Sequence, residues 1–569
     1  MHTAGAALLE ALNEAGVSYI FANFGSDHPA LLEALAEAKA KGRPAPTVVT
    51  SPSEFVGMCA ADGFARITGQ AQAVVVHVEC GTQSLGGAIH NAVKARVPVF
   101  VFAGSSPYTQ DGELKGSRNE FIQWIQDVFD QRGIVRGYMK YDNELRTGAN
   151  LKQMVHRAMQ FAHSAPRGPV YLMAAREVME DVVAPVTLDP AHWQAVEPPA
   201  LSPSAVAAIA ADLRAAKAPL IVTSYLGRNP AAPRVLQEFC EAYGIGVLES
   251  VPSAMNFPPD HPLHQGIQWN QKSQNESLTA ADLVLVLDSD IPWIGAHNRP
   301  SASARVHHID LDVLKEQMPL FYIPAICRAK ADCATALAQL QAALAAHPPA
   351  AALTAARKAL WAERHNAVTA RRNDAERSAQ GQVSAVSLMA ALRGLIDDDA
   401  IVVNEGVTNY QPVFDHLGMC RPGSIFTSGA GSLGWFGGAC IGVKLAAPDK
   451  TVIAVAGDGS YMFSQPSSVF WMARHYGTPF LQIVLNNRGW KAPRLSMLSL
   501  HPDGYGAKAN DIGVAFDPPP DYGAIAAAAG GAAALSIKRF DEIEPVLCEA
   551  LRVVRAEKRC AVVDAWLDG

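Results

Sequence analysis

The stretch VAGDGSYMFSQPSSVFWMARHYGTPFLQIVLNNRGW, residues 455–490, contains two apolar runs that each end in polar residues. The first run ends in the turn Gly-Asp-Gly at 457–459, and the second ends in Asn486 and Asn487. The segment between them has the length and pattern of a helix, so the expected order is strand, helix, strand, with both strands buried in a parallel sheet. Ligands of such sheets bind at the carboxyl ends of the strands. The stretch therefore predicts an α/β sheet with a polar site at one edge.

The polar residues at these strand ends suit a phosphate and a metal ion. Gly457 and Gly459 let the backbone approach a phosphate and offer it N–H groups. Asp458 and the Asn487 side chain are oxygen ligands, the Gly489 carbonyl is a third, and phosphate oxygens and water complete an octahedral Mg²⁺ site. The alternative interpretation is an acidic turn and an asparagine turn without a ligand. The position of both turns directly after buried strands favours a site for magnesium and a diphosphate.

The alternation of helix-like and strand-like segments extends over the whole chain. A proline-rich segment at 184–206 and a charged, alanine-rich segment at 345–382 interrupt it. These breaks indicate linkers. The sequence therefore predicts an α/β protein of three doubly wound parallel-sheet domains, at 1–185, 200–345 and 383–569.

Composition excludes several functional classes. The 569 residues are 49% hydrophobic and 18% charged, and the net charge of -7 gives no electrostatic reason to bind nucleic acid or an anionic membrane. The most apolar long stretch, at 523–537, is too weakly hydrophobic to span a bilayer, and the first residues lack the basic segment of a signal peptide. Nine cysteines without a CxxC pair fit a reducing compartment. We expect a cytoplasmic protein with neither nucleic-acid nor membrane partners.

The pattern GDGS followed by NN resembles the thiamine-diphosphate signature of the family that includes benzoylformate decarboxylase, pyruvate decarboxylase and acetolactate synthase. The resemblance covers nearly the whole chain, and the motifs NEG, PGSIF, SLG and GVKLAAPDK are most similar to those of benzoylformate decarboxylase. It implies an N-terminal domain that holds the aminopyrimidine, a central domain, and a C-terminal domain that holds the diphosphate and Mg²⁺. It also implies a homodimer or homotetramer with active sites at the subunit interface.

Glu54 lies in SPSEFVGMCAADGFARITG, which resembles the family segment where a glutamate precedes an ADG-aromatic-AR run. The resemblance implies that Glu54 hydrogen-bonds the pyrimidine N1′. A carboxyl group there favours the imino tautomer that removes the thiazolium C2 proton, more so in a dry pocket. The residues alone also allow a simpler interpretation, in which Glu54 is an acidic first-turn residue after Ser53 that complements a helix dipole.

Two further loops resemble cofactor contacts of the family. VVNEGVT is similar to the loop that meets the diphosphate and the thiazolium ring, and FTSGAGSLGWF to the turn that cradles the cofactor. In that turn Leu433 is the apolar residue that props the two rings into a V, or else an ordinary core leucine. The implied cofactor-binding residues are Glu54, Asn404, Glu405, Thr408, Ser428, Gly429, Leu433, Gly457, Asp458, Gly459, Ser460 and Asn487.

A 2-oxo acid needs a donor for its carboxylate and an acid or base near C2 as carbon dioxide leaves. By resemblance Ser26 is that donor, although it could instead cap the helix that follows. His77 matches a histidine for proton transfer, although a lone histidine in an apolar strand is often a buried structural residue. His297, in IPWIGAHNRP, is the candidate for a second histidine. With Glu54, these three residues form the predicted catalytic set.

The expected activity is a thiamine-diphosphate-dependent decarboxylase of 2-oxo acids that can also ligate the product to an aldehyde. One alternative is an acetolactate-synthase-like carboligase that joins two 2-oxo acids, and another is a non-catalytic binding module of the same fold. The intact glutamate, aspartate and asparagine of the motifs argue against the module. Trp435, Phe436 and Trp490 either narrow the substrate pocket or belong to the core. The central domain shows no flavin-contact pattern, so we predict no FAD.

Overall fold

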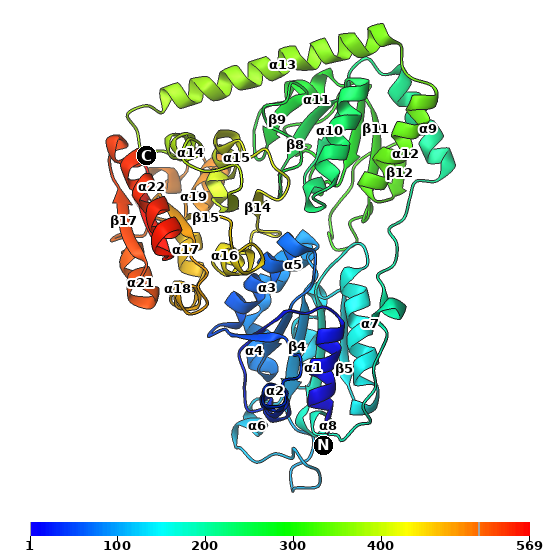
Figure 1. Cartoon of the computed structure of the whole chain (residues 1–569). Coiled ribbons are helices and arrows are strands. Elements are labelled where there is room, and N and C mark those ends of the chain that lie inside the picture. The colour runs from blue at the N-terminus through cyan, green and yellow to red at the C-terminus, as the bar shows by residue number, and fades with distance from the viewer. Residues whose placement is uncertain (1, 510–511, 569) are drawn as a thin grey trace.

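Three parallel sheets of six strands each organise the chain in the computed structural model, which describes residues 2–509 and 512–568. Figure 1 shows the first sheet in blue and cyan, the second in green, and the third in yellow to red. Parallel neighbours need a crossover between them, so helices alternate with the strands throughout. The prediction of an α/β protein with three doubly wound parallel sheets is confirmed.

The first sheet has the strand order β2-β1-β3-β4-β6-β5. Its interior strand β3 reads AVVV and is buried at every position, whereas the edge strand β2 reads TVVT and exposes both threonines. The strands are β1 (Tyr19–Ala22), β2 (Thr47–Thr50), β3 (Ala73–Val76), β4 (Phe100–Ser105), β5 (Tyr141–Leu145) and β6 (Val170–Ala175). The helices are α1 (Ala4–Glu14), α2 (Pro29–Ala40), α3 (Glu54–Thr68), α4 (Val78–Ser84), α5 (Gly86–Ala95), α6 (Ile122–Ile125), α7 (Leu151–His163) and α8 (Arg176–Met179).

The second sheet has the order β12-β11-β10-β7-β8-β9. Its strands are β7 (Pro219–Thr223), β8 (Gly246–Ser250), β9 (His264–Gln268), β10 (Leu283–Leu287), β11 (Arg305–Asp310) and β12 (Cys327–Lys330), and its helices are α9 (Pro203–Ala215), α10 (Ala232–Tyr243), α11 (Glu276–Ala280) and α12 (Cys333–Ala346). The charged segment that follows forms α13 (Ala351–Ser378), which runs along the outside of the molecule to the third sheet (Figure 1).

The third sheet has the order β14-β13-β15-β16-β18-β17. Its strands are β13 (Ile401–Glu405), β14 (Ile425–Thr427), β15 (Val452–Gly457), β16 (Leu481–Asn486), β17 (Ala533–Ile537) and β18 (Ala561–Trp566). Its helices are α14 (Ala385–Arg393), α15 (Tyr410–Leu417), α16 (Trp435–Ala446), α17 (Asp458–Phe463), α18 (Pro466–His475), α19 (Lys491–Leu500), α20 (Tyr505–Lys508), α21 (Tyr522–Gly530) and α22 (Ile543–Arg552). The apolar stretch at 523–537 forms α21 and β17, and no helix in the described ranges is long and apolar enough to cross a membrane.

Helices α3 and α16 join the first and third sheets through direct backbone contact (Figure 1). A Cβ atom on Gly442 would lie 1.8 Å from the Ala60 carbonyl oxygen, and one on Gly63 would lie 2.2 Å from the Ala439 oxygen. Only glycine permits such close approach. One hydrophobic core therefore runs through both domains.

Candidate active site

Three adjacent strands of the third sheet end at, or directly before, residues that were predicted to bind the cofactor. β13 ends at Glu405, β15 at Gly457 and β16 at Asn486, and β15 lies between the other two. Asp458 and Asn487 follow directly, so the sheet order brings both strand ends to one edge. The sequence predicted this arrangement from the two apolar runs.

Asp458 ties the ends of β15 and β16 together. It is buried at the start of α17, where Gly489 N–H donates to Oδ2 at 2.9 Å and Gly459 N–H donates to Oδ1 at 2.8 Å. Burial raises the pKa of this carboxyl, and the hydrogen bonds from backbone N–H groups oppose the rise. A Cβ on Gly489 would lie 2.1 Å from the Val514 carbonyl oxygen, so the turn requires glycine.

The two asparagines at the end of β16 have different surroundings. Asn486 donates to Asp564 Oδ1 at 2.9 Å and accepts from the Arg488 N–H at 3.1 Å. The buried Oδ1 of Asn487 has no hydrogen-bond partner among the described residues. A buried oxygen without a hydrogen-bond partner destabilises the folded state unless a ligand binds to it. Asp458, Asn487 and the Gly489 carbonyl therefore fit the donor set that Mg²⁺ prefers.

Glu405 holds the loop before α16 in place. Gly434 N–H donates to Oε1 at 2.5 Å and Phe436 N–H donates to Oε2 at 3.0 Å. Burial raises the pKa of this carboxyl to about 7, and the two backbone hydrogen bonds oppose the rise. Asn404 accepts from Gly406 N–H at 3.0 Å, and its buried Nδ2 has no partner within the described ranges. Both oxygens of the glutamate thus serve the protein backbone.

A buried asparagine from the first domain positions the predicted cofactor turn. Asn91 Oδ1 accepts from the N–H groups of Ala430 and Ser432, and its Nδ2 donates to the Ser432 carbonyl at 2.8 Å. A Cβ on Gly429 would lie 2.1 Å from the Asn91 carbonyl oxygen. Leu433 follows on this turn and is half-buried. The role of Asn91 was not predicted, because IHNA carries no motif.

The remaining predicted cofactor residues lie close to these strand ends. Ser428 follows β14, and its Oγ lies 3.3 Å from the Tyr410 hydroxyl. Thr408 lies in a short turn directly after β13, where Val407 has φ +51°. A β-branched residue rarely adopts that conformation, so the turn is held under strain. Ser460 is buried in α17, two residues after Asp458.

Glu54 lies at the carboxyl edge of the first sheet. It is the first residue of α3, and Ser53 caps that helix by accepting from Val56 N–H. Asn23, which follows β1, donates from Nδ2 to Glu54 Oε1 at 2.8 Å. This hydrogen bond fixes one carboxyl oxygen and leaves the other for a ligand. Helix start and ligand site are therefore compatible roles for the same residue.

His77 follows the neighbouring strand β3 and pairs with a buried aspartate. Its Nδ1 lies 2.6 Å from Asp27 Oδ1, and this hydrogen bond raises the pKa of His77. Burial alone would raise the pKa of Asp27, but the charges and hydrogen bonds of His28 and His77 lower it below its ordinary range. A Cβ on Gly25 would lie 1.9 Å from His77 Nδ1, so the approach depends on that glycine. The sequence predicted a functional role for His77 but none for Asp27.

The other two predicted catalytic residues have fewer contacts. Ser26 is half-buried on the turn beside Asp27, and it does not cap α2, because His28 is the residue before that helix. His297 is exposed on a loop of the second domain, where its backbone N–H donates to the Ile294 carbonyl. In the described part of the chain, no hydrogen bond joins His297 to Glu54 or to His77. Ser26, Glu54 and His77 each follow a strand at the carboxyl edge of the first sheet, whereas His297 lies on a loop of the second domain.

The three bulky aromatic residues differ in location. Trp435 and Phe436 belong to the core, and the Trp435 indole donates to Asp62 Oδ1 at 2.7 Å. Trp490 packs edge-on against Phe463 and Phe516 and lines a pocket of about 630 Å³ next to α17. Only Trp490 of the three is therefore placed to contact a ligand.

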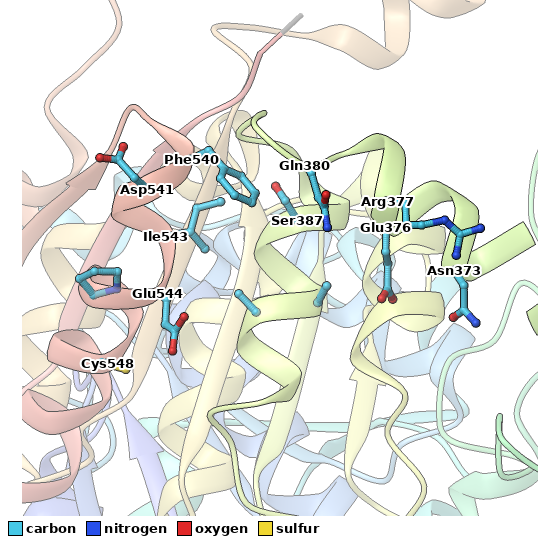
Figure 2. Close-up of a pocket in the computed structure, with 13 residues that line it drawn as sticks. Asn373, Glu376, Arg377, Gln380, Ser387, Phe540, Asp541, Ile543, Glu544 and Cys548 are labelled. Atoms are coloured by element: carbon cyan, nitrogen blue, oxygen red, sulfur yellow. The ribbon is translucent and has the colours of Figure 1, made fainter. Parts of the chain in front are cut away.

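A further cavity of about 850 Å³ lies between the end of α13, α14 and the start of α22. Figure 2 shows Phe540 and Ile543 on one side and Glu376, Arg377 and Gln380 on the other. None of the predicted site residues lines it. Its size alone does not connect it with the strand ends described above.

A buried ionic cluster links the first and second domains at the carboxyl ends of β10 and β11. Arg96 forms two hydrogen bonds with the Asp290 carboxylate, at 2.8 and 3.0 Å. Lys315 Nζ lies 2.6 Å from Asp310 Oδ2 and 2.8 Å from Asp290 Oδ1, and its side chain is fully buried. The cluster fixes the orientation of the two domains.

Comparisons with known proteins agree with this architecture. The chain matches the thiamine pyrophosphate enzyme models for the N-terminal TPP binding domain at residues 2–134, the central domain at 206–340 and the C-terminal TPP binding domain at 406–565. It is 27% identical over 417 residues to the acetolactate synthase isozyme 1 large subunit of Escherichia coli, covering 71% of this chain and 68% of that one. It is 25% identical over 505 residues to benzoylformate decarboxylase of Pseudomonas aeruginosa, covering 87% and 88%.

A solved structure of benzoylformate decarboxylase from Polynucleobacter necessarius shares the fold, with a TM-score of 0.77 at 18% identity over 100% of this chain and 99% of that chain. The three matched models follow one another along the chain and together account for most of it. From the matched domains and the shared architecture, we conclude that the chain belongs to the thiamine pyrophosphate enzymes.

Proposed function

We propose that the protein is a thiamine-diphosphate-dependent lyase that cleaves the C–C bond next to the carbonyl of a 2-oxo acid and releases carbon dioxide and an aldehyde. The observation that carries the proposal is the placement of Glu54 and His77 at the carboxyl edge of the same sheet. Asn23 holds the glutamate and Asp27 holds the histidine. A carboxyl group for the cofactor and a proton donor for the substrate are the two groups that this reaction needs.

The binding roles follow from the oxygen and N–H groups at the carboxyl edge of the third sheet. Asp458, Asn487 and the Gly489 carbonyl would bind Mg²⁺, while the N–H groups at 457–459 would meet the diphosphate. When bound, thiamine diphosphate would supply the carbon nucleophile that adds to the substrate carbonyl. It would also accept the electron pair that carbon dioxide leaves behind. The free oxygen of Glu54 would hydrogen-bond the aminopyrimidine.

The substrate roles concern the carboxylate and one proton. Ser26 would donate to the substrate carboxylate from the turn beside Asp27. His77, whose pKa is raised by its hydrogen bond to Asp27, would deliver a proton to the carbon that loses carbon dioxide. A well-placed proton donor favours aldehyde release over attack on a second carbonyl compound. This argument favours a decarboxylase over a carboligase.

We further propose a homodimer or homotetramer in which the site forms between two copies. Among the described residues, no hydrogen bond or ion pair joins Glu54 or His77 to Asp458 or Asn487 in one chain. Large apolar side chains are exposed beside His77 on the segment 121–129. Exposed apolar patches of this kind commonly mark protein interfaces.

Product analysis tests the proposed activity. Purified protein with Mg²⁺ and thiamine diphosphate is given benzoylformate and pyruvate separately, and carbon dioxide, aldehyde and acyloin products are followed by chromatography. We expect benzaldehyde from benzoylformate, strongly reduced in Glu54→Gln and unchanged in Glu33→Gln, an exposed glutamate on α2. Acetolactate from pyruvate with little free aldehyde would instead assign a carboligase.

A further inference from the structure

A second set of hydrogen bonds reaches the outer nitrogen of His77. His77 Nε2 lies 3.0 Å from Gln126 Oε1, Gln126 Nε2 donates to Cys80 Sγ at 3.2 Å, and Cys80 Sγ donates to Glu79 Oε1 at 3.0 Å. We propose that Gln126, oriented by Cys80, is a positioning residue that holds a proton on His77 Nε2 in the resting enzyme. The catalytic meaning of that proton rests on the proposed function.

The orientation of the Gln126 amide decides the protonation state of the imidazole. An amide oxygen only accepts, so the ring nitrogen that faces it must carry a proton. Asp27 Oδ1 accepts from the other ring nitrogen, so both nitrogens donate and the ring is an imidazolium. The opposite amide orientation would turn the NH₂ group toward Nε2 and require a neutral ring.

Cys80 favours one of the two orientations while its S–H donates to Glu79. Its S–H points to Glu79, which leaves a sulfur lone pair for the Gln126 NH₂ group. Desolvation and the hydrogen bond to Glu79 raise the pKa of the thiol, so that it keeps its proton at neutral pH. With NH₂ toward sulfur, the amide oxygen faces His77.

The backbone of Gln126 is anchored independently of its side chain. Its N–H donates to the Ile122 carbonyl at 2.8 Å and closes α6, and its carbonyl accepts from Ser106 Oγ at 3.1 Å just after β4. The amide therefore meets His77 from a fixed position rather than from a free loop. Such support is what positions a functional side chain.

Loss of the Nε2 proton would reverse the arrangement. The unprotonated nitrogen would face an amide oxygen, so the amide would turn over, its NH₂ would donate to Nε2, and the Cys80 S–H would donate to Oε1. One proton leaves the ring and no other covalent bond changes. The titratable groups around His77 are Asp27, with His28 on the same turn, and Glu79 on α4, while Glu54 lies close enough to Cys80 to raise the pKa of its thiol.

NMR of the full-length protein, ¹³C-labelled at histidine and loaded with thiamine diphosphate and Mg²⁺, tests the proposal. The His77 signal is the one that His77→Asn removes. Its titration midpoint should fall by about one pH unit in Gln126→Leu, because one hydrogen bond to a charged group is lost. The midpoint should rise in Gln126→Glu and fall in Cys80→Ala. It should not move in Gln83→Leu, at an exposed position on α4.

An unchanged midpoint in both Gln126→Leu and Cys80→Ala would overturn the proposal. The NMR titration needs no turnover, so a protein that decarboxylates no 2-oxo acid refutes the proposed function without deciding this one. Where turnover is found, the alkaline limb of the kcat/KM profile should move to lower pH in Gln126→Leu by the same displacement. A uniformly lower rate with an unmoved limb would indicate a merely structural glutamine.

Discussion

The substitution Asn487→Leu is expected to stabilise the protein without cofactor and to remove most of its stabilisation by cofactor. The buried Oδ1 of Asn487 has no partner in the described part of the chain, so the folded protein retains the cost of desolvating it. Replacing the amide by an apolar group of similar shape removes that cost, which we estimate at about 1 kcal/mol. The same change removes one oxygen ligand from the proposed Mg²⁺ site.

The expected loss of cofactor stabilisation follows from binding linkage. At a ligand concentration 100 times its Kd, binding stabilises a protein by about 2.7 kcal/mol. If losing one metal ligand weakens binding by about 100-fold, the gain at the same concentration falls to about 0.4 kcal/mol. Urea unfolding with and without thiamine diphosphate and Mg²⁺ measures both quantities on the same variant.

Asn486→Leu is the matched control, because the neighbouring asparagine has both partners. Its replacement leaves Asp564 Oδ1 and the Arg488 N–H without their hydrogen bonds, at a cost of roughly 2–4 kcal/mol in the protein without cofactor. The two variants should therefore change the free energy of unfolding in opposite directions. Asn487→Leu that is less stable than wild type without cofactor, yet still gains the full stabilisation with it, would refute the assignment of Asn487 as a ligand.

Three further predictions concern charged groups. Asp27→Asn should move the alkaline limb of the pH–rate profile to lower pH, because the aspartate raises the pKa of His77. An unmoved limb would show that His77 is not the proton donor. Lys315→Met should lower the free energy of unfolding by about 3–5 kcal/mol in urea, since it leaves the buried Asp310 carboxylate unpaired; equal stability would show that the cluster is dispensable. Burial raises the pKa of Glu405 from 4.5 to about 7, so the folded state keeps a proton that the unfolded state releases and stability falls as the pH rises between these values, by up to about 3 kcal/mol. In Glu405→Gln this part of the pH dependence should disappear from urea unfolding curves, and its persistence would contradict the protonated state.

The strands, and the strand ends of the proposed site, could be predicted because their signals are local. Apolar runs such as AVVV at 73–76 read as buried strands without knowledge of their neighbours. Once a strand is placed, its last residue lies at the carboxyl edge, where Asp458 and Asn487 were expected. Local pattern and sheet topology thus suffice for the residues that end a strand.

Residues that act through distant partners could not be predicted in the same way. Asp27 and Gln126 lie 50 and 49 positions from His77 in the chain, and nothing in either segment specifies their meeting. Asn91 reaches the turn at 430–432 only because α3 and α16 bring the two domains together. His297 stays a prediction, because its side chain lies on an exposed loop of the second domain and no contact within the chain tests its role.

The contact between α3 and α16 explains why glycines, which have no side chain to contribute to the chemistry, matter to the proposed site. α3 begins at Glu54, and α16 begins two residues after Leu433, so each helix starts at one half of the site. The backbone contact at Gly442 holds these two halves in one relative orientation within the chain. In the proposed dimer, the first half of each copy faces the second half of the other, so the same contact sets the geometry of both composite sites. Displacements of about 1 Å can cost about 100-fold in rate, and a close-packed helix pair is the means to exclude them.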